Sequence, residues 1–374
     1  MIKHIDVIVP CYNEESSLDR FWKESGEAFS AIEGYEFRYI FIDDGSTDET
    51  LQKIRRLAAL QETAKGEASD APDPDTILGA SDAPGPDTIL GTSDTSGLDT
   101  ILGATGDPAP GNPGACPEVS YISFSRNFGK EAAMYAGLQA SDGDFAVIMD
   151  ADLQHPPQLV GEMIRIVEET GCDSCAARRV SRKGEPKIRS ALARAFYKLM
   201  NRYSDIEIVD GAVDFRLMNR KMVKAIVGMP ENQRFSKGIF AWVGFNTEWI
   251  EFENVKRIAG ESKWTMWGLM KYALDGFIDF AEAPLKFVGV LGGLTTLCSA
   301  VYFIIEFLKT VIVGKDTPGY ASTICLILFF GGLIIAILSL IAEYIGRMYM
   351  ETKGRPIYIE KESNIDEDKE RKAD

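Results

Sequence analysis

Two long apolar segments in the C-terminal third of the chain place the strongest constraint on how it can fold. Residues 287–308 contain one charged side chain, Glu306, and residues 321–342 contain none. Each segment is 22 residues long, and about 20 residues of helix suffice to cross the hydrocarbon core of a bilayer. A buried helix in a soluble protein is the alternative, but two such segments lie twelve residues apart. The pattern predicts a two-helix transmembrane hairpin within residues 286–347.

The basic residues around these segments predict their orientation. Lysine and arginine gather on the cytoplasmic side of membrane proteins. The sequence outside the hairpin carries seven basic residues near its two ends, and the connecting loop carries two. We therefore expect a multi-pass protein of the cytoplasmic membrane with both termini in the cytoplasm. The outer basic residues are Arg257, Lys263, Lys271, Lys286, Arg347, Lys353 and Arg355, and those of the loop are Lys309 and Lys315.

The segment before the first apolar run, residues 256–285, has the pattern of a membrane-surface element. Within it, Trp264–Phe280 contains three charged residues spaced four apart, which share one face of a helix. The other side chains are mainly aromatic and aliphatic, which suits a helix lying in the membrane interface. An ordinary packing helix is the alternative. The three charges are Lys271, Asp275 and Asp279.

Residues 1–255 alternate strand-like and helix-like patterns. This alternation is typical of an α/β domain with a mostly parallel sheet and helices on both faces. In such sheets, ligands bind beyond the carboxyl ends of the strands. The strand-like runs are Ile5–Pro10, Phe37–Asp43, Val119–Phe124, Phe145–Asp150 and Asp173–Ala177. The helix-like runs are Glu15–Ile32, Asp48–Leu60, Lys130–Ala140, Pro157–Glu169 and Pro186–Tyr203.

Two acidic appendages account for most of the net charge of −16. A predicted insertion at 61–117 contains three twelve-residue repeats rich in Asp, Pro and Gly. Such repeats cannot bury a core, so we expect a flexible acidic loop, with a β-solenoid as the alternative. Residues 348–374 have the composition of a charged cytoplasmic tail. The rest of the chain shows no basic surface pattern, so nucleic acid is not expected as a partner.

The clearest chemical signal follows the apolar run that ends at residue 150. Asp150 and Asp152 stand two residues apart at a predicted strand end, where both carboxylates can face one divalent cation. Gln154 can supply a third oxygen. Hard oxygen ligands suit Mg²⁺ or Mn²⁺, which commonly bridge to substrate phosphates. A pair of helix-capping aspartates is the alternative.

Two further strand ends carry polar residues suited to a nucleotide. Asp43 and Asp44 follow the second strand-like run and can accept hydrogen bonds from a base or a ribose. Capping of the next helix by Ser46–Asp48 is the alternative interpretation of that turn. After the first run, residues 10–15 offer an aromatic face and polar acceptors at the same sheet edge.

A basic motif opens the helix-like run at residue 130. Arg126 and Lys130 lie at the N-terminal end of that run. Cationic side chains and free backbone N–H groups at a helix N-terminus suit a phosphate. Together with the carboxylates, these residue types indicate a nucleotide diphosphate and a metal ion.

Seven motifs, in order along the chain, resemble those of the family-2 glycosyltransferases. Within that family the resemblance is to the polyprenyl-phosphate branch, the bactoprenol glucosyltransferases and dolichol-phosphate mannose synthases. It covers nearly the whole chain, including the two apolar segments, and departs at the repeats, where the family has a short connection. The motifs are VPCYNEE, IDDGSTD, FSRNFGKEAAMYAGL, MDADLQHPP, VDFRLMNR, RFSKGIFAWVGF and RIAGESKW.

The resemblance implies a GT-A fold, an inverting transfer and a role for each motif. Asp152 and Asp214 take catalytic roles, and Asp214 faces the reacting centre. The alternative for Asp214 is a structural ion pair with a nearby arginine, Arg216 or Arg220. The residues expected to hold the nucleotide-sugar are Pro10, Tyr12, Glu14, Asp43, Asp44, Arg126, Lys130 and Asp150. Those expected near the phosphates of donor and acceptor are Arg179, Arg182 and Lys263, and the metal ligands are Asp150, Asp152 and Gln154.

We therefore expect an enzyme that transfers one sugar from a nucleotide-sugar to a polyprenyl phosphate, with UDP-glucose and undecaprenyl phosphate as the best candidates. A GDP-mannose-dependent mannose synthase or another UDP-sugar donor is the alternative within the branch. A processive polysaccharide synthase is disfavoured because the sequence has no QxxRW-like motif. A lipid carrier or flippase subunit with an inactive transferase domain is the alternative outside enzymes. The resemblance also favours a homo-oligomer.

Overall fold

The computed structural model describes residues 2–69, 117–180, 201–202, 208–252, 283–313 and 319–365. Several sequence predictions fall outside these ranges. They are the interfacial helix at Trp264–Phe280, the twelve-residue repeats, most of the helix-like run Pro186–Tyr203, and the two phosphate-binding residues Arg182 and Lys263.

The N-terminal domain is built on an eight-stranded sheet with the order β7-β5-β6-β4-β1-β2-β3-β8. Strands β4, β1, β2 and β3 run parallel, as do β5 and β7, whereas β6 and β8 are antiparallel to their neighbours. The mostly parallel α/β sheet expected of a GT-A domain is confirmed, and all five strand-like runs form strands; β6, β7 and β8 were not predicted. The strands are β1 Lys3–Cys11, β2 Tyr35–Asp43, β3 Glu118–Phe124, β4 Phe145–Ile148, β5 Ser174–Arg179, β6 Ala212–Asn219, β7 Thr247–Phe252 and β8 Glu360–Ser363.

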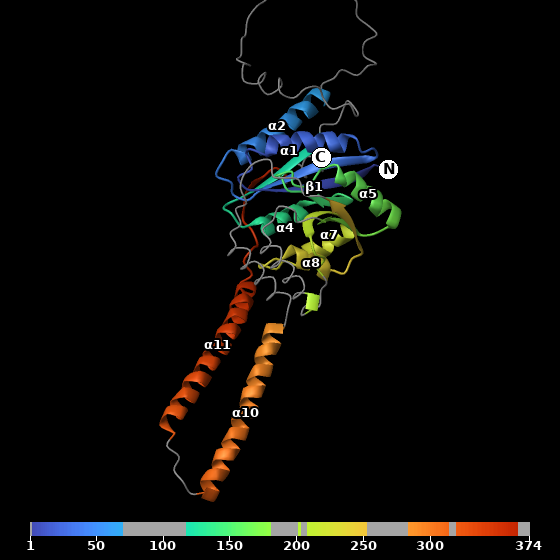
Figure 1. The fold of residues 1–374 in the computed structure, drawn as a ribbon. Coiled ribbons are helices and arrows are strands. Elements are labelled where there is room, and N and C mark those ends of the chain that lie inside the picture. The colour runs from blue at the N-terminus through green and yellow to red at the C-terminus, as the bar shows by residue number, and fades with distance from the viewer. Residues whose placement is uncertain are drawn as a thin grey trace, which may run out of the picture.

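Helices cover both faces of this sheet (Figure 1). Helices α1, α2 and α5 pack on one face, and α4, α7 and α8 pack on the face toward the C-terminal hairpin. Strand β1 shows the reason, since Val7 and Val9 join the first apolar cluster and Ile8 joins the second. Successive side chains of a strand point to opposite faces, so a continuous apolar run is buried on both. The helices are α1 Leu18–Ser30, α2 Thr50–Ser69, α4 Lys130–Ala140, α5 Leu159–Thr170, α7 Arg220–Val227 and α8 Ser236–Trp242.

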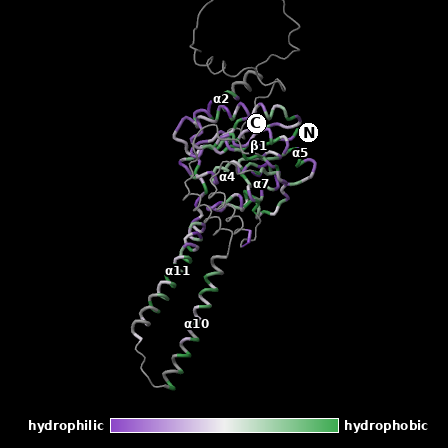
Figure 2. The backbone as a smooth tube through the Cα atoms, in the orientation of Figure 1, coloured by the Kyte–Doolittle hydropathy of each residue, from purple (hydrophilic) through white to green (hydrophobic). Residues whose placement is uncertain are grey.

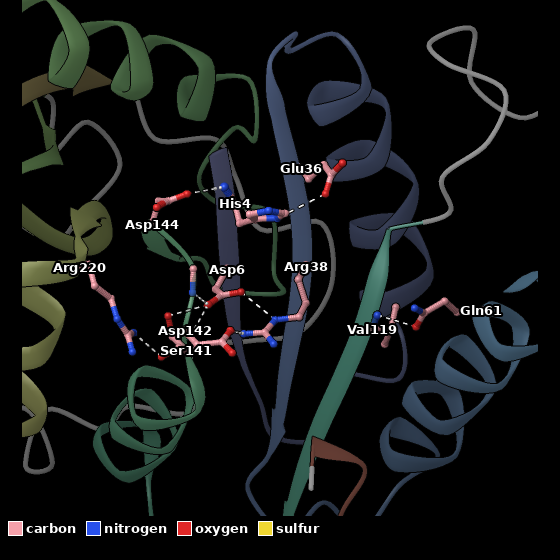
Figure 3. Close-up of polar contacts among 11 residues, drawn as sticks. His4, Asp6, Glu36, Arg38, Gln61, Val119, Ser141, Asp142, Asp144 and Arg220 are labelled. Atoms are coloured by element: carbon pink, nitrogen blue, oxygen red, sulfur yellow. Dashed lines mark hydrogen bonds and ion pairs between the residues drawn. The ribbon is translucent and has the colours of Figure 1, made fainter. Parts of the chain in front are cut away.

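A buried carboxylate, Asp6, ties together the region near the amino ends of the central strands (Figure 3). Arg38 Nε and Ser141 Oγ each donate to it at 2.8 Å, as do the backbone N–H groups of Asp142 and Gly143. Asp6 is 2% exposed, and a buried charge is tolerated only when it is paired and fully hydrogen-bonded. This network therefore has a structural role.

The first residues of the predicted insertion belong to the fold. The boundary at residue 61 was wrong, because α2 continues to Ser69. Gln61 is 4% exposed, and its Oε1 accepts a hydrogen bond of 2.8 Å from the N–H of Val119, the second residue of β3. This contact joins the helix that leads into the insertion to the strand that follows it.

The residues after the hairpin do not form the simple charged tail that their composition predicted. Within 348–374, strand β8 pairs antiparallel with β3, and Ile365 is 7% exposed in an apolar cluster shared with β2, β3 and α4. Arg55 Nε donates to Glu362 at 2.8 Å. Without this addition β3 would be an open sheet edge, which natural sheets cover. A four-residue polar strand carries too little pattern to be recognised in sequence.

Helices α10 and α11 form a long hairpin that projects from the sheet domain (Figure 1). Apolar residues run along both helices (Figure 2), and Val290, Leu297 and Ile335 are each more than 60% exposed. Exposed apolar surface of this extent marks a membrane or protein contact. Within the described residues, Phe329–Thr352 is long and apolar enough to cross a membrane, and Phe287–Ser299 is a shorter apolar helical stretch. α10 spans Ala283–Val313 and α11 spans Tyr320–Thr352.

Candidate active site

The register of the sheet brings two distant carboxylates together at the carboxyl end of β4. Strands β4 and β6 are antiparallel with Ile148 opposite Arg216, and continuing that register by two residues sets Asp150 beside Asp214. The ammonium group of Lys130, in the first turn of α4, lies 2.7 Å from Asp150 Oδ1 and 3.0 Å from Asp214 Oδ2. One cation and two carboxylates, here called the Lys130 cluster, therefore meet where the sequence predicted ligand binding.

The charges of the Lys130 cluster stabilise one another. Burial acts to lower the pKa of Lys130, but Asp150 and Asp214 raise that pKa above its ordinary value. Burial acts to raise the pKa of Asp214, but Lys130 and, more weakly, Lys237 and Arg216 hold that pKa well below its usual range. Lys130 and Asp214 are therefore both ionised at neutral pH. The Lys130 side chain is 40% exposed, so a ligand can reach the cluster from solvent.

The two arginines considered as ion-pair partners of Asp214 make other contacts. Arg220 donates to the carbonyl of Ser141. Arg216 is 3% exposed and lies over the ring of Phe240, 3.8 Å from its centroid. Burial lowers the pKa of Arg216 to about 10, against the opposing effect of Asp214. The ion pair of Asp214 is made with Lys130, and Arg216 adds a buried positive charge nearby.

The loop after β4 folds around Asp152. Asp152 Oδ1 accepts a hydrogen bond of 3.1 Å from the N–H of Gln154, and Oδ2 accepts one of 2.9 Å from the side-chain amide of the same residue. Leu153, between them, has a φ of 54°, a left-handed conformation that costs free energy in a branched residue and is held by the surrounding turn. Gln154 thus orients Asp152.

The chemistry of these donors fits one kind of metal site. Asp150 and Asp152 present the carboxylate oxygens that Mg²⁺ and Mn²⁺ prefer. Among the residues that the structure describes, no group of three or more His, Cys, Asp or Glu side chains is arranged to hold a metal ion. Two carboxylates suit a cation whose coordination is completed by water and substrate phosphates, as is usual for Mg²⁺.

His155 supports this loop and was not assigned a role from the sequence. It is 7% exposed, its ring stacks on Phe215 with 5.4 Å between centroids, and it meets Phe252 edge-on at 5.2 Å. Burial lowers its pKa, so the ring is neutral at pH 7. Its Nδ1 is buried without a hydrogen-bond partner within the described part of the chain. The sequence did offer one signal for a role of His155, which is its position in the same motif as Asp150 and Asp152.

The loops after β1 and β2 are joined by hydrogen bonds. The N–H of Asn13 donates to Ser46 Oγ at 3.0 Å, and the N–H of Glu14 donates to Thr50 Oγ1 at 2.8 Å. Tyr12 directly precedes Asn13 in the loop after β1 and is 36% exposed. An accessible aromatic ring on a fixed loop suits stacking with a nucleobase.

Asp43 and Asp44 point into the protein, being 1% and 3% exposed. Asp44 accepts hydrogen bonds from the N–H groups of Phe128 at 2.6 Å and Gly129 at 2.9 Å. Asp43 accepts one from Ser123 Oγ at 2.8 Å. Asp44 therefore holds the basic loop before α4 in place, and Asp43 ties the end of β2 to β3, roles that the sequence did not reveal. The contact of both residues with a nucleoside stays a prediction.

The structure brings the remaining predicted residues to the same sheet edge. Pro10 lies one residue before the end of β1, and Arg179 is the last residue of β5. The guanidinium of Arg126 lies over the ring of Phe128, 4.0 Å from its centroid. Arg126 is thus held beside the loop that Asp44 fixes.

Two family models match this chain. The one described as glycosyl transferase family 2 matches residues 6–66 and 111–227, and the one described as the GtrB C-terminal hairpin matches residues 283–348. The chain belongs to glycosyltransferase family 2. The first match omits residues 67–110, so the repeats lie outside what the family shares.

Known proteins resemble this glycosyltransferase over nearly its whole length. CsbB of Bacillus subtilis (strain 168), a glycosyltransferase by name, is 37% identical, covering 96% of this chain and 92% of its own. The prophage bactoprenol glucosyl transferase homolog of Escherichia coli (strain K12) is 34% identical, covering 95% and 97%. A mannosyltransferase from Pyrobaculum calidifontis, solved with GDP-Man and Mn²⁺, superposes with a TM-score of 0.44 and 15% identity, covering 93% and 88%.

Asp44 should make the stability of this glycosyltransferase depend on pH. Burial, opposed by its two backbone hydrogen bonds, raises the pKa of Asp44 from 3.8 to about 6. The folded state therefore binds a proton more tightly than the unfolded state, and this stabilisation is lost as the pH rises through 6. Between about pH 5 and pH 7 the loss should be about 1 kcal/mol.

The measurement is thermal unfolding of the full chain in detergent at both pH values, for the wild type and Asp44→Asn. The wild type should lose more stability on going to pH 7 than the variant does. Asp19→Asn, which alters an exposed carboxylate paired with Lys53, is the control and should follow the wild type. Equal pH dependence in the wild type and Asp44→Asn would contradict the raised pKa.

Proposed function

We propose that this glycosyltransferase transfers one sugar, with inversion, from a nucleotide-sugar to a polyprenyl phosphate at the cytoplasmic face of the membrane. UDP-glucose and undecaprenyl phosphate are the proposed substrates. The observation that carries the proposal is a charged transferase site in the same chain as a matched GtrB hairpin. Proteins named bactoprenol glucosyl transferase, such as that of Shigella phage SfX at 33% identity over 95% of this chain, support the choice of acceptor and sugar.

Asp150, Asp152 and Gln154 would hold a divalent cation, Mg²⁺ or Mn²⁺, and Gln154 also orients Asp152 through its two hydrogen bonds. When bound, such a cation neutralises charge that develops on the departing diphosphate. Lys130 places a further positive charge beside Asp150. Fixed charges of this kind act without reorganising during the reaction, which makes them effective in catalysis.

The acceptor explains why a strong base is not needed. An oxygen of the lipid phosphate forms a bond to the anomeric carbon, and the bond from that carbon to the nucleoside diphosphate breaks. A phosphate monoester has a second pKa near 6 and is largely dianionic at neutral pH, so no proton has to be removed first. Asp214, whose pKa is held low by Lys130, is a poor proton acceptor and instead keeps the lysine in place.

The face of the sheet that carries α4 lies toward the hairpin (Figure 1), as an acceptor anchored in the membrane requires.

Binding of the nucleoside by Pro10, Tyr12 and Glu14, and of the phosphates by Arg126 and Arg179, remains part of the proposal. So do the multi-pass topology with both termini in the cytoplasm and assembly into a homo-oligomer. The roles of Arg182 and Lys263 are proposed from sequence alone.

The test is a donor panel. Purified full-length protein with Mg²⁺ or Mn²⁺ and undecaprenyl phosphate is offered UDP-glucose, other UDP-sugars and GDP-mannose, and both nucleoside diphosphate and glycolipid are measured. We expect a glucosyl lipid from UDP-glucose. A mannosyl lipid from GDP-mannose would move the protein to the mannose synthases. Nucleotide release without glycolipid would refute the acceptor.

A further inference from the structure

The C-terminal end of α11 is joined to the catalytic domain through Glu351. Glu351 Oε1 accepts hydrogen bonds from the N–H groups of Asn232 at 2.8 Å and Gln233 at 3.4 Å, and Oε2 accepts one from the Asn232 side-chain amide at 3.2 Å. Both partners belong to residues 228–235, here called the α7–α8 loop. A single carboxylate of the hairpin therefore fixes three donors of this loop, and hydrogen bonds to a charged acceptor are stronger than neutral ones.

The α7–α8 loop in turn packs on the helix that carries Lys130. At its end, the N–H of Ser236 donates to Glu131 Oε2 at 3.1 Å, and the Ser236 hydroxyl donates to the same oxygen. Glu131 directly follows Lys130. The guanidinium of Arg234, which is 8% exposed, lies over the ring of Tyr135 on α4, 4.4 Å from its centroid. A continuous set of contacts thus runs from Glu351 to the first turn of α4.

A second attachment fixes the chain beyond the hairpin. Strand β8 pairs with β3, and Asn364 accepts from the N–H of Tyr121 at 2.7 Å and donates to the carbonyl of Val119 at 3.1 Å. Just before β8, the ring of Tyr358 stacks on Phe124 at 4.7 Å, and its hydroxyl donates to Gln139 at 3.1 Å. These contacts hold the chain beyond the hairpin on the β3 side of the domain, whereas the Glu351 contact joins the end of α11 itself to the α7–α8 loop.

We propose that Glu351 is a positioning residue for the lipid-borne acceptor, acting through the α7–α8 loop. A soluble nucleotide-sugar can enter the site whatever the placement of the catalytic domain over the membrane. A phosphate held at headgroup depth can reach the Lys130 cluster only at one height and orientation of that domain. Glu351 sets that placement. The inference rests on the proposed lipid acceptor.

The experiment compares Glu351→Gln with a matched control, Glu343→Gln. Glu343 lies on the same helix, is 55% exposed, and pairs within the helix with Arg347 at 3.2 Å. The full-length proteins are reconstituted in phospholipid nanodiscs containing undecaprenyl phosphate. Glu351→Gln should raise the KM for the lipid about tenfold, because the site would no longer be held in place over the lipid phosphate. The affinity for UDP, measured by calorimetry, should be unchanged. Glu343→Gln should match the wild type in both.

Amide hydrogen exchange supplies a readout independent of activity. The N–H groups of Asn232, Gln233 and Ser236 should exchange faster in Glu351→Gln and not in Glu343→Gln. A KM for the lipid equal in the two variants, or a weakened affinity for UDP in Glu351→Gln, would overturn the proposal. A wild type that forms no glycolipid would refute the proposed function instead, and unaltered exchange at Ser236 would then refute the coupling separately.

Discussion

Asp152→Asn is expected to lower glycolipid formation by at least about 10³-fold, equivalent to about 4 kcal/mol of transition-state stabilisation. The change keeps the size of the side chain and an oxygen that can accept the N–H of Gln154, so the loop should persist. It removes the negative charge with which this residue would hold a divalent cation on the donor diphosphate. The measurement is the initial rate of glycolipid formation, together with the affinity for Mn²⁺ in the presence of UDP.

Folding and surface charge are controlled separately. Thermal unfolding of Asp152→Asn should match the wild type within about 1 kcal/mol, because the side chain is partly exposed and Gln154, which donates two hydrogen bonds to it, belongs to the same loop. Asp19→Asn removes an exposed carboxylate remote from the cluster and should retain full activity. Wild-type activity in Asp152→Asn would remove this residue from the proposed metal site.

Lys130→Met should reduce glycolipid formation about 10²- to 10³-fold, on the scale of losing one preorganised charge at an active site. Methionine keeps the apolar part of the side chain but removes the ammonium group between Asp150 and Asp214. Because Lys130 is the main charge that lowers the pKa of Asp214, that pKa should rise in the variant. The variant should therefore lose more stability at pH 7 than at acidic pH, where Asp214 without its lysine takes up a proton more readily.

Two comparisons isolate the role of the charge. Lys224→Met changes an exposed lysine in the last turn of α7 and should leave the rate and the pH dependence unaltered. In the double variant Lys130→Met/Asp214→Asn the like-charge repulsion is relieved, so its loss of stability should be smaller than the sum of the two single losses. Additive losses would show that Lys130 and Asp214 do not interact in solution.

The parts of this protein that depend on local pattern could be predicted. Apolar runs ending in Pro10, Asp43 and Asp150 form parallel strands because burial on both faces selects continuous apolar sequence. The two apolar segments form the helices of a hairpin because an apolar run of about 22 residues with at most one charge can fold in few other ways. The family motifs then indicated that this α/β domain is a glycosyltransferase.

The parts that depend on side-chain direction could not be predicted. Asp43 and Asp44 were expected to face a ligand, and the sequence did not reveal that Asp43 accepts a hydrogen bond from Ser123 on β3 and that Asp44 accepts two from the loop before α4. Sequence places a residue at a strand end but does not say whether its side chain turns outward or back into the protein. His155 was overlooked for the same reason, since its aromatic partners come from β6 and β7.

The sequence by itself determined the α/β class, the carboxyl-edge location of the site and the apolar hairpin, because each follows from residue type and periodicity over a few neighbouring positions. Tertiary structure decided that Lys130 joins Asp150 to Asp214, that β8 closes the edge of β3, and that Glu351 binds the α7–α8 loop. Each of these contacts pairs residues at least twenty positions apart, and strand register and helix packing, which no local pattern encodes, set which partners meet.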